Sequence, residues 1–272
     1  MPGFSSYDDM ITEITTNGKV FSYQYLKAFV AAQAAGQWMT GWTAVGAPGA
    51  GAAPATTPGT AYGNTAGGIT LADTTTDLKA LLTFGACATQ NSTVMLYDRL
   101  VGVSGISIAS TGAKTISSTA LTRYTGTASV GVQAWLEVTT ATTTTAAVVN
   151  LNSYTNEGGT AARSGGSYTF PNAAMPAGFA CQLPMQAGDM GLRSVEVGLN
   201  VGTATTAGVV NVVLIRPLTY LPLIANQWNE RDLVLQLAAM PRVFDQATLG
   251  LMLLASNTTA TTVWGSLNIA WG

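Results

Sequence analysis

Residues 192–217 constrain the fold of this chain more than any other stretch. Apolar residues occupy every second position from Val195 to Val201, with polar residues or glycine between them. This period of two is typical of a strand with one buried face. After a break of small residues, the β-branched run at residues 209–215 indicates a second strand, buried on much of both faces. Together they predict a long antiparallel hairpin.

Similar patterns predict further strands at residues 93–100, 103–109, 129–139, 147–155, 249–255 and 263–271. In the strand at residues 129–139, Trp135 and Glu137 occupy the face opposite the apolar residues, so we expect them to face solvent. Pro217 and Pro222 bracket the next apolar segment and argue against a central strand there, because proline cannot donate to a ladder.

Helices are predicted at residues 7–14, 77–82 and 229–240, and helix formers also fill residues 26–37. Ser5 or Ser6 can cap the first helix, a threonine before Asp77 the second, and Asn229 the third. The chain shows no strand–helix–strand alternation and no repeat of fixed spacing. It is therefore predicted to be mainly β, a two-sheet antiparallel sandwich of jelly-roll type with two or three short helices and an extended N-terminal arm.

The predicted arm and its connector comprise residues 1–68, and the β-sandwich body comprises residues 69–272. Residues 46–68 are rich in Gly, Ala, Pro and Thr and carry no charge, which indicates an extended connector without a core of its own. Aromatic residues ahead of such a connector are suited to dock on a neighbouring subunit. The interface candidates are Phe21, Tyr23, Tyr25, Trp38 and Trp42. The alternative is that this segment packs on the core of its own chain.

Charged residues make up only 9% of the chain, against about 25% in ordinary soluble domains. A surface with so few charges is poorly protected against association, so we expect partner subunits to cover much of it. A secreted threonine-rich β-protein is the alternative. The eleven Lys and Arg residues are scattered and the net charge is −2, so binding to nucleic acid through clustered cations is not expected.

The sequence contains no histidine, which removes the commonest general base and metal ligand. The four lysines lack a Ser-x-x-Lys spacing, and the glycine-rich segments lack the ending of a phosphate-binding loop. Glu137 and Glu196 each stand alone on their predicted strands. We therefore expect no enzyme, no cofactor and no metal site. Cys87 and Cys181 lie far apart in apolar contexts and are predicted to be buried free thiols, with a disulfide as the alternative.

The first residues show neither the basic nor the apolar segment of a secretory signal. No window reaches the roughly 18 apolar residues of a membrane-spanning helix. We expect a protein that is made in a cytoplasm, has no membrane partner and stays soluble until it assembles.

Several segments together resemble a family of tailed-bacteriophage virion structural proteins. They are SYTNEGGTAARSGG (residues 153–166), MQAGDMGLRSVEVGLNVGTATTAGVVNVVL (185–214), RPLTYLPL (216–223), NERDLVLQLAAMPRVFD (229–245) and the closing WGSLNIAWG. The resemblance covers roughly residues 90 to 272 and is weaker at the N-terminal end. None of these segments is a catalytic motif, so the resemblance specifies kinship and not a site.

The resemblance implies a structural component of the virion. We expect a capsid cement or decoration protein on the head, forming homotrimers, with the major capsid protein and copies of itself as partners. One alternative is a tail or baseplate module that binds host carbohydrate through Trp135 or Tyr154. Another is the major capsid protein itself, for which the chain lacks a convincing long spine helix.

Overall fold

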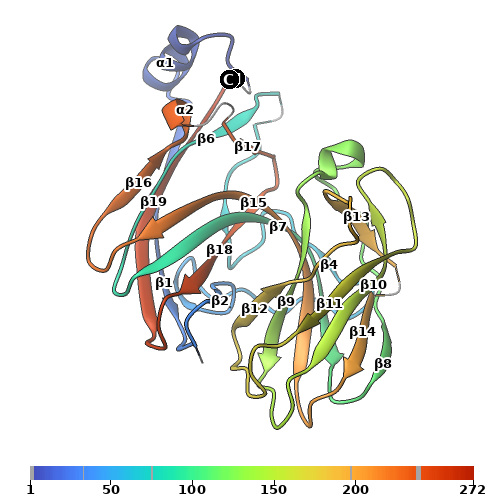
Figure 1. The fold of residues 1–272 in the computed structure, drawn as a ribbon. Helices are drawn as coiled ribbons and strands as arrows, with labels where there is room; N and C mark the ends of the chain where they lie inside the picture. Colours follow the sequence, from blue (N-terminus) through green and yellow to red (C-terminus); the bar gives the residue numbers. More distant parts are fainter. Residues whose placement is uncertain (1–2, 33, 75, 197, 237–239) are drawn as a thin grey trace.

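The computed structural model describes residues 3–32, 34–74, 76–196, 198–236 and 240–272. Its regular structure is almost entirely antiparallel β, arranged in three sheets (Figure 1). The helical elements described are α1 (Tyr7–Thr15), a 3-10 turn (Gly126–Ser129) and α2 (Leu233–Gln236). The mainly β class with short helices is therefore confirmed.

Six strands of the largest sheet close into a barrel. In order around it, they are β7 (Ser92–Ser107), β15 (Val209–Leu223), β9 (Gln133–Thr140), β12 (Phe179–Gln182), β2 (Gln37–Thr40) and β18 (Thr248–Ala255). Strand β18 pairs with β7 and so completes the ring. The short strands β4 (Thr60–Ala61) and β5 (Ile69–Thr70) add to β7 and β18 from outside the ring. The antiparallel sheets are consistent with the expected β-sandwich, but six strands also close into a ring, and the pairing does not establish a jelly roll.

Two smaller sheets flank the barrel. One has the order β16 (Asn229–Asp232), β6 (Lys79–Ala88), β19 (Thr261–Trp271), β1 (Val20–Phe29) and β3 (Val45–Ala47), with β17 (Arg242–Val243) also paired to β6. We call it the β1 sheet. The other has the order β11 (Arg163–Thr169), β10 (Val148–Asn156), β14 (Gly198–Thr203) and β8 (Gly112–Thr115), with β13 (Leu192–Val195) paired to β10. We call it the β10 sheet.

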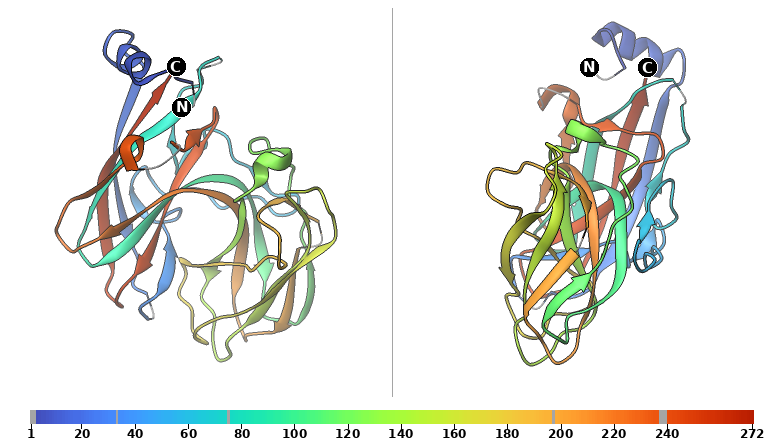
Figure 2. Two further views of the ribbon diagram at one scale, coloured as in Figure 1. Left: turned by 45° about the horizontal axis from the view of Figure 1, so that its top comes forward. Right: turned by 90° about the vertical axis from the view of Figure 1, so that its right-hand side faces the viewer.

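The flanking sheets lie at opposite sides of the barrel, and the long strands β7 and β15 run through both halves of the molecule (Figures 1 and 2). One apolar cluster joins the inner faces of both flanking sheets to outward-facing positions of the barrel; it includes Leu81, Phe84 and Leu267, Val149, Leu151 and Leu199, and Leu96, Leu136, Leu214 and Leu251. The alternate positions of the barrel strands form a separate cluster inside the ring. Strands of the barrel are therefore buried on both faces.

The strands predicted at residues 192–217 exist, but they do not pair with each other, so the predicted hairpin is wrong. Strand β14 pairs with β10 and β8, whereas β15 pairs with β7 and β9 in the barrel. The small-residue break therefore carries the chain from one layer to another. Leu199 and Val201 are buried as the alternation predicts, and residues 210–215 are all buried because β15 lies between the barrel interior and the flanking core. Val197 lies outside the described residues.

Helix α1 is confirmed, and Ser6 is its cap, accepting a hydrogen bond from the Asp9 amide. The helix predicted at residues 77–82 is wrong, because strand β6 begins at Lys79. The helix formers at residues 26–37 begin inside strand β1, which extends to Phe29. Burial in a sheet outweighs local helix propensity here. The helix predicted at residues 229–240 is reduced to the single turn α2, capped by Asp232, which accepts from the amides of the second and third helical residues. The sequence also places Leu233 and Leu237 on one face of this helix, and Leu237 lies outside the described residues.

Strand β15 continues through Pro217 and Pro222, but this part of it is not a central strand, as the prolines predict. Its pairing with β9 ends at Ile215, while its pairing with β7 continues to Leu223. Beyond Ile215 the strand thus has a single ladder partner, and proline is tolerated where one side of a strand makes no ladder bonds.

The prediction of an extended N-terminal arm is also wrong. Strand β1 lies between β19 and β3, and β2 is part of the barrel, so the pairing does not follow a division at residue 68. The connector packs closely on the barrel at Gly59: a Cβ there, where φ is +85°, would lie 2.4 Å from the Gly102 carbonyl oxygen. The chain exposes 10520 Å², close to the roughly 11,000 Å² expected for a compact monomer of this mass.

Candidate functional site

The interior of the barrel is apolar over most of its length and ionic at one end. Each of the six strands contributes to the apolar part, which consists of Trp38, Met95, Tyr97, Trp135, Ala180, Val213, Ile215 and Met252. At the ionic end, Arg99 of β7 and Glu137 of β9 form two hydrogen bonds, Nη1–Oε1 at 2.7 Å and Nη2–Oε2 at 2.8 Å. The Thr40 hydroxyl also donates to Glu137. The expectation that Glu137 faces solvent is wrong, because the polar face of β9 lines the barrel.

Two aromatic rings enclose this ion pair. The Arg99 guanidinium carbon lies 4.4 Å from the centroid of the Trp42 ring and 4.9 Å from that of Tyr62. The Trp42 indole N–H donates to the Ala52 carbonyl in the connector. The connector thus lies over the ionic end of the barrel, and both side chains of the pair are buried.

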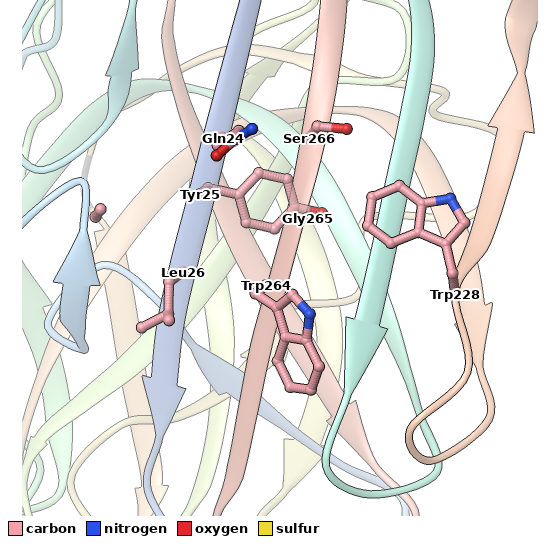
Figure 3. Close-up of a pocket in the computed structure, with 8 residues that line it drawn as sticks. Gln24, Tyr25, Leu26, Trp228, Trp264, Gly265 and Ser266 are labelled. Atoms are coloured by element: carbon pink, nitrogen blue, oxygen red, sulfur yellow. The ribbon is translucent and has the colours of Figure 1, made fainter.

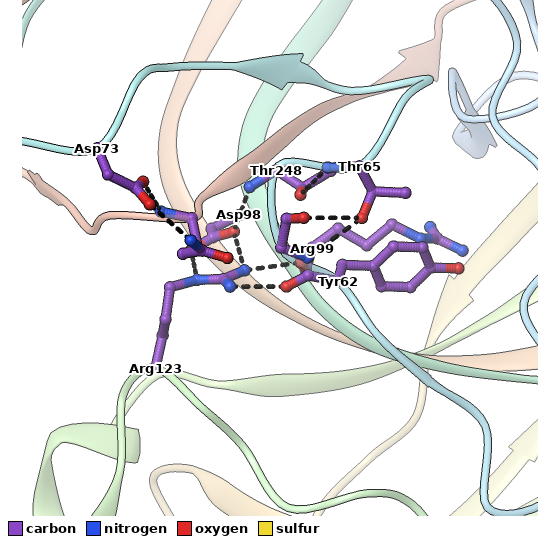
Figure 4. A network of polar contacts seen from close by, with 9 residues as sticks. Tyr62, Thr65, Asp73, Asp98, Arg99, Arg123 and Thr248 are labelled. Carbon is purple, nitrogen blue, oxygen red and sulfur yellow. Dashed lines mark hydrogen bonds and ion pairs between the residues drawn. The ribbon is translucent and has the colours of Figure 1, made fainter.

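A second buried ion pair fastens the connector to the body (Figure 4). Arg123 donates to both carboxylate oxygens of Asp98, at 2.9 and 2.8 Å, and to the Tyr62 carbonyl at 2.7 Å. Asp98 also accepts from the Thr248 amide of β18. These bonds tie together β7, β18, the connector and the loop that carries Arg123. Their role is structural.

The five interface candidates have different environments. Tyr25 and Trp42 are buried in the core of their own chain, so neither is available to a partner. Trp38 is partly buried and packs edge-on against Trp135 inside the barrel. Phe21 and Tyr23 are half-buried on β1, with stacked rings 5.9 Å apart between centroids. Only this last pair lies near an open part of a sheet.

The two aromatic residues considered for carbohydrate binding are not exposed. Trp135 lies inside the barrel, and its indole N–H donates to Gln133. Tyr154 belongs to the core of the β10 sheet, and its hydroxyl donates to Asp189. Burial and this hydrogen bond raise the pKa of Tyr154 to about 12. Neither ring can stack on a sugar, so the prediction of a carbohydrate site at Trp135 or Tyr154 is wrong.

Strand β1 presents an open backbone edge. It pairs with β19 along its whole length, but β3 covers only residues 26–28 on the other side. The Trp271 amide donates to the Lys19 carbonyl, so alternate residues from Lys19 face β19 and the residues between them face outward. Ser22 and Gln24 therefore direct their backbone groups away from the sheet, and no partner for these groups occurs among the described residues.

This open edge carries no charge. Residues 20–25 read VFSYQY, whereas the edge strands β16, β11 and β8 each contain at least one charged residue. The remaining strands at sheet edges, such as β3, β4 and β5, are only two or three residues long. Proteins protect exposed edges with charges, prolines or short strands, because an unprotected edge recruits another strand. Residues 20–25 are thus the unprotected edge of the described fold.

Next to this edge, the outer face of the β1 sheet carries a groove of about 530 Å³ (Figure 3). Trp264 of β19 and Trp228, from the loop before β16, line the groove together with Gln24, Leu26 and Ser266. Figure 3 shows both indoles with their ring faces turned toward the viewer.

Sequence reasoning missed this pair of tryptophans. The alternation in β19 does place Trp264, Ser266 and Asn268 on one face and Val263, Leu267 and Ile269 on the other, so a signal for Trp264 exists. Trp228 lies in a loop, and its position over β6 depends on tertiary structure alone.

The described residues contain no group of three or more His, Cys, Asp or Glu side chains placed to hold a metal ion. Cys87 and Cys181 are free and buried, as predicted. Burial raises the pKa of the Cys181 thiol, which keeps it protonated and unreactive. In the described part of the chain, no helix is long and apolar enough to cross a membrane. Comparison with known protein families, curated proteins and solved structures finds no match to this chain.

Proposed function

We propose that the protein is a non-enzymatic structural subunit of a phage head, a cement or decoration protein that stabilises the lattice of the major capsid protein. The observation that carries the proposal is the uncharged open edge at residues 20–25 of β1. The proposed occupant is an extended segment of the major capsid protein, which adds a strand to this edge through backbone hydrogen bonds. The segments that resemble phage virion proteins are the reason for placing the subunit on a head.

The distribution of charge supports a surface covered by partners. Six charged side chains are buried inside the chain: Lys27, Lys79, Asp98, Arg99, Arg123 and Glu137. The chain has only eleven basic and thirteen acidic residues, so its surface is even less charged than its composition indicates. Such a surface favours association.

Contacts between copies are proposed to use α1 and α2, at the end of the β1 sheet where β1 begins. There α1 and α2 lie close together, near the C-terminal end of β19 (Figures 1 and 2). Tyr7 and Ile11 of α1 are each 53% exposed, and Leu235 of α2 is 78% exposed. Large apolar side chains gathered on two neighbouring elements indicate a contact surface. A homotrimer formed here is proposed to use the helix side chains, whereas the capsid contact uses the backbone groups of β1.

Occupancy on purified particles tests the proposal. Val20→Lys places a charge on the open edge, and Ser164→Lys is the matched control on β11, an edge strand that already carries Arg163. We expect the wild type and Ser164→Lys in the head shell at equal copy number, with Val20→Lys reduced at least tenfold although it folds. Full occupancy by Val20→Lys, or a wild-type protein found only in the tail, would contradict the proposal.

A further inference from the structure

We infer that the groove on the outer face of the β1 sheet binds a neutral saccharide, with Trp228 and Trp264 as its stacking surfaces. This inference does not rest on the proposed assembly role. It concerns the face of the sheet, whereas the proposed capsid contact uses the backbone edge of β1.

The two indoles are held flat by the sheet beneath them. Trp228 lies over Gly85 of β6, where a Cβ would come within 2.4 Å of the indole ring. The Glu230 carboxylate accepts from the Trp228 indole N–H at 3.3 Å. In the ladder, Ser266 pairs with Gly85 and Trp264 pairs with Cys87, so the two tryptophans lie over adjacent strands. Trp228 is nevertheless 52% exposed, which leaves a ring face open to a ligand.

The polar side chains in the groove are free to bind a ligand. Neither the Gln24 amide, the Ser266 hydroxyl nor the Trp264 indole N–H has a hydrogen-bond partner among the described residues. The adjacent row is different, because Ser22 donates to Asn268 and Asn268 donates to Thr83. Polar groups without internal partners therefore concentrate beside the tryptophans.

The charge of the groove selects the class of ligand. No residue that lines it is charged, and the carboxylate of Glu230, beside Trp228, already accepts from the Trp228 indole N–H. A ligand must therefore be neutral, have a flat apolar face for the indoles and offer hydroxyl or amide groups to Gln24 and Ser266. A pyranose ring combines these properties, since its C–H bonds form an apolar face and its hydroxyl groups lie around the rim. Ligand sites generally combine aromatic walls with a few placed polar groups.

Tryptophan fluorescence and calorimetry on the full chain test this inference. The probes are neutral oligosaccharides of glucose, galactose and mannose, with and without N-acetylated sugars, and a uronic acid oligosaccharide as the charged comparison. We expect at least one neutral probe to bind and the charged probe to bind at least tenfold more weakly. Trp228→Ala and Trp264→Ala should each weaken binding at least tenfold. Tyr7→Ala, which removes an exposed aromatic ring from α1, should leave binding unchanged.

Three results would overturn the inference: no binding by any neutral probe, binding that survives both tryptophan substitutions, or tighter binding of the charged probe. If the tryptophan variants bind every sugar as the wild type does but lose occupancy on particles, the groove is a protein contact and not a saccharide site. Val20→Lys separates the two proposals, because it should lose occupancy while keeping wild-type sugar binding.

Discussion

Arg99 and Glu137 form a bidentate ion pair inside the closed barrel, with side chains that are 0% and 2% exposed. Removing one partner leaves the other charge buried and uncompensated. We predict that Glu137→Gln lowers the free energy of unfolding by about 3–5 kcal/mol, measured by urea denaturation.

The double variant Arg99→Met/Glu137→Leu is the control for this prediction. It removes both charges and keeps apolar volume between Trp42 and Tyr62, so most of the lost stability should return. A double variant that is less stable than Glu137→Gln would show that the pair contributes more than mutual neutralisation.

Gly250 of β18 makes room for the Tyr97 ring inside the barrel. A Cβ at this position would lie 2.5 Å from the ring, closer than van der Waals contact allows. Gly250→Ala should therefore destabilise the fold by about 1–3 kcal/mol through overpacking, seen as a lower denaturation midpoint. Gly202→Ala on β14 is the matched control, since its Cβ would meet nothing closer than 3.7 Å. Equal stability of the two variants would argue against a tightly packed barrel interior.

Lys27 is buried with its ammonium bonded to the carbonyls of Ala44 and Gly49, and no carboxylate among the described residues pairs with it. Burial lowers the pKa of Lys27 to about 8 from 10.5. Between these values the unfolded chain binds more protons than the folded one, so stability should rise with pH. We predict that the wild type gains about 2–3 kcal/mol on that account as pH rises through this window, of which about half is reached by pH 9.5.

Denaturation curves at pH 7.0 and 9.5 measure this effect. Lys27→Met should remove the rise, whereas Lys114→Met, at a half-buried lysine that donates to Ser110, should keep it. The range stops at pH 9.5 because burial raises the pKa of tyrosines such as Tyr97, which opposes the rise at higher pH. An identical pH dependence in wild type and Lys27→Met would refute the prediction.

Asp189 holds together one end of the β10 sheet. It accepts hydrogen bonds from Arg163, Tyr154 and Asn156, which hold its pKa at about 2, below the usual 3.8. A lowered carboxylate pKa stabilises the fold above pH 4, and this contribution is lost as pH falls toward 2. Asp189→Asn should therefore cost about 1–3 kcal/mol at pH 6, and the cost should shrink at pH 2. A cost independent of pH would contradict this assignment.

The sequence allowed individual elements to be predicted better than their partners. The Ser6 cap and the alternation at Leu199 and Val201 are local signals, and both are confirmed. Strands β14 and β15 are neighbours in sequence yet belong to different sheets, because pairing is decided by contacts distant in the chain. Alternation also cannot distinguish solvent from a barrel interior. From alternation alone, Glu137 is predicted to be a surface residue, although it lies inside the closed barrel.

The same limit applies to the candidate binding surfaces. The tryptophan of β19 is on the polar face of its strand, so its exposure could be inferred from alternation. Trp228 comes from a loop, and no local sequence pattern predicts where that loop lies. Tyr25 and Trp42 show the reverse case, because aromatic residues near a flexible-looking connector proved to be core residues of their own chain.

A reconstruction of the intact particle, at a resolution that traces individual strands, tests the central claim most directly. The account predicts this chain on the head shell, with an extended segment of the major capsid protein hydrogen-bonded to the outward backbone groups of Ser22 and Gln24. A particle in which residues 20–25 face solvent, or in which the chain occurs only in the tail, would contradict it.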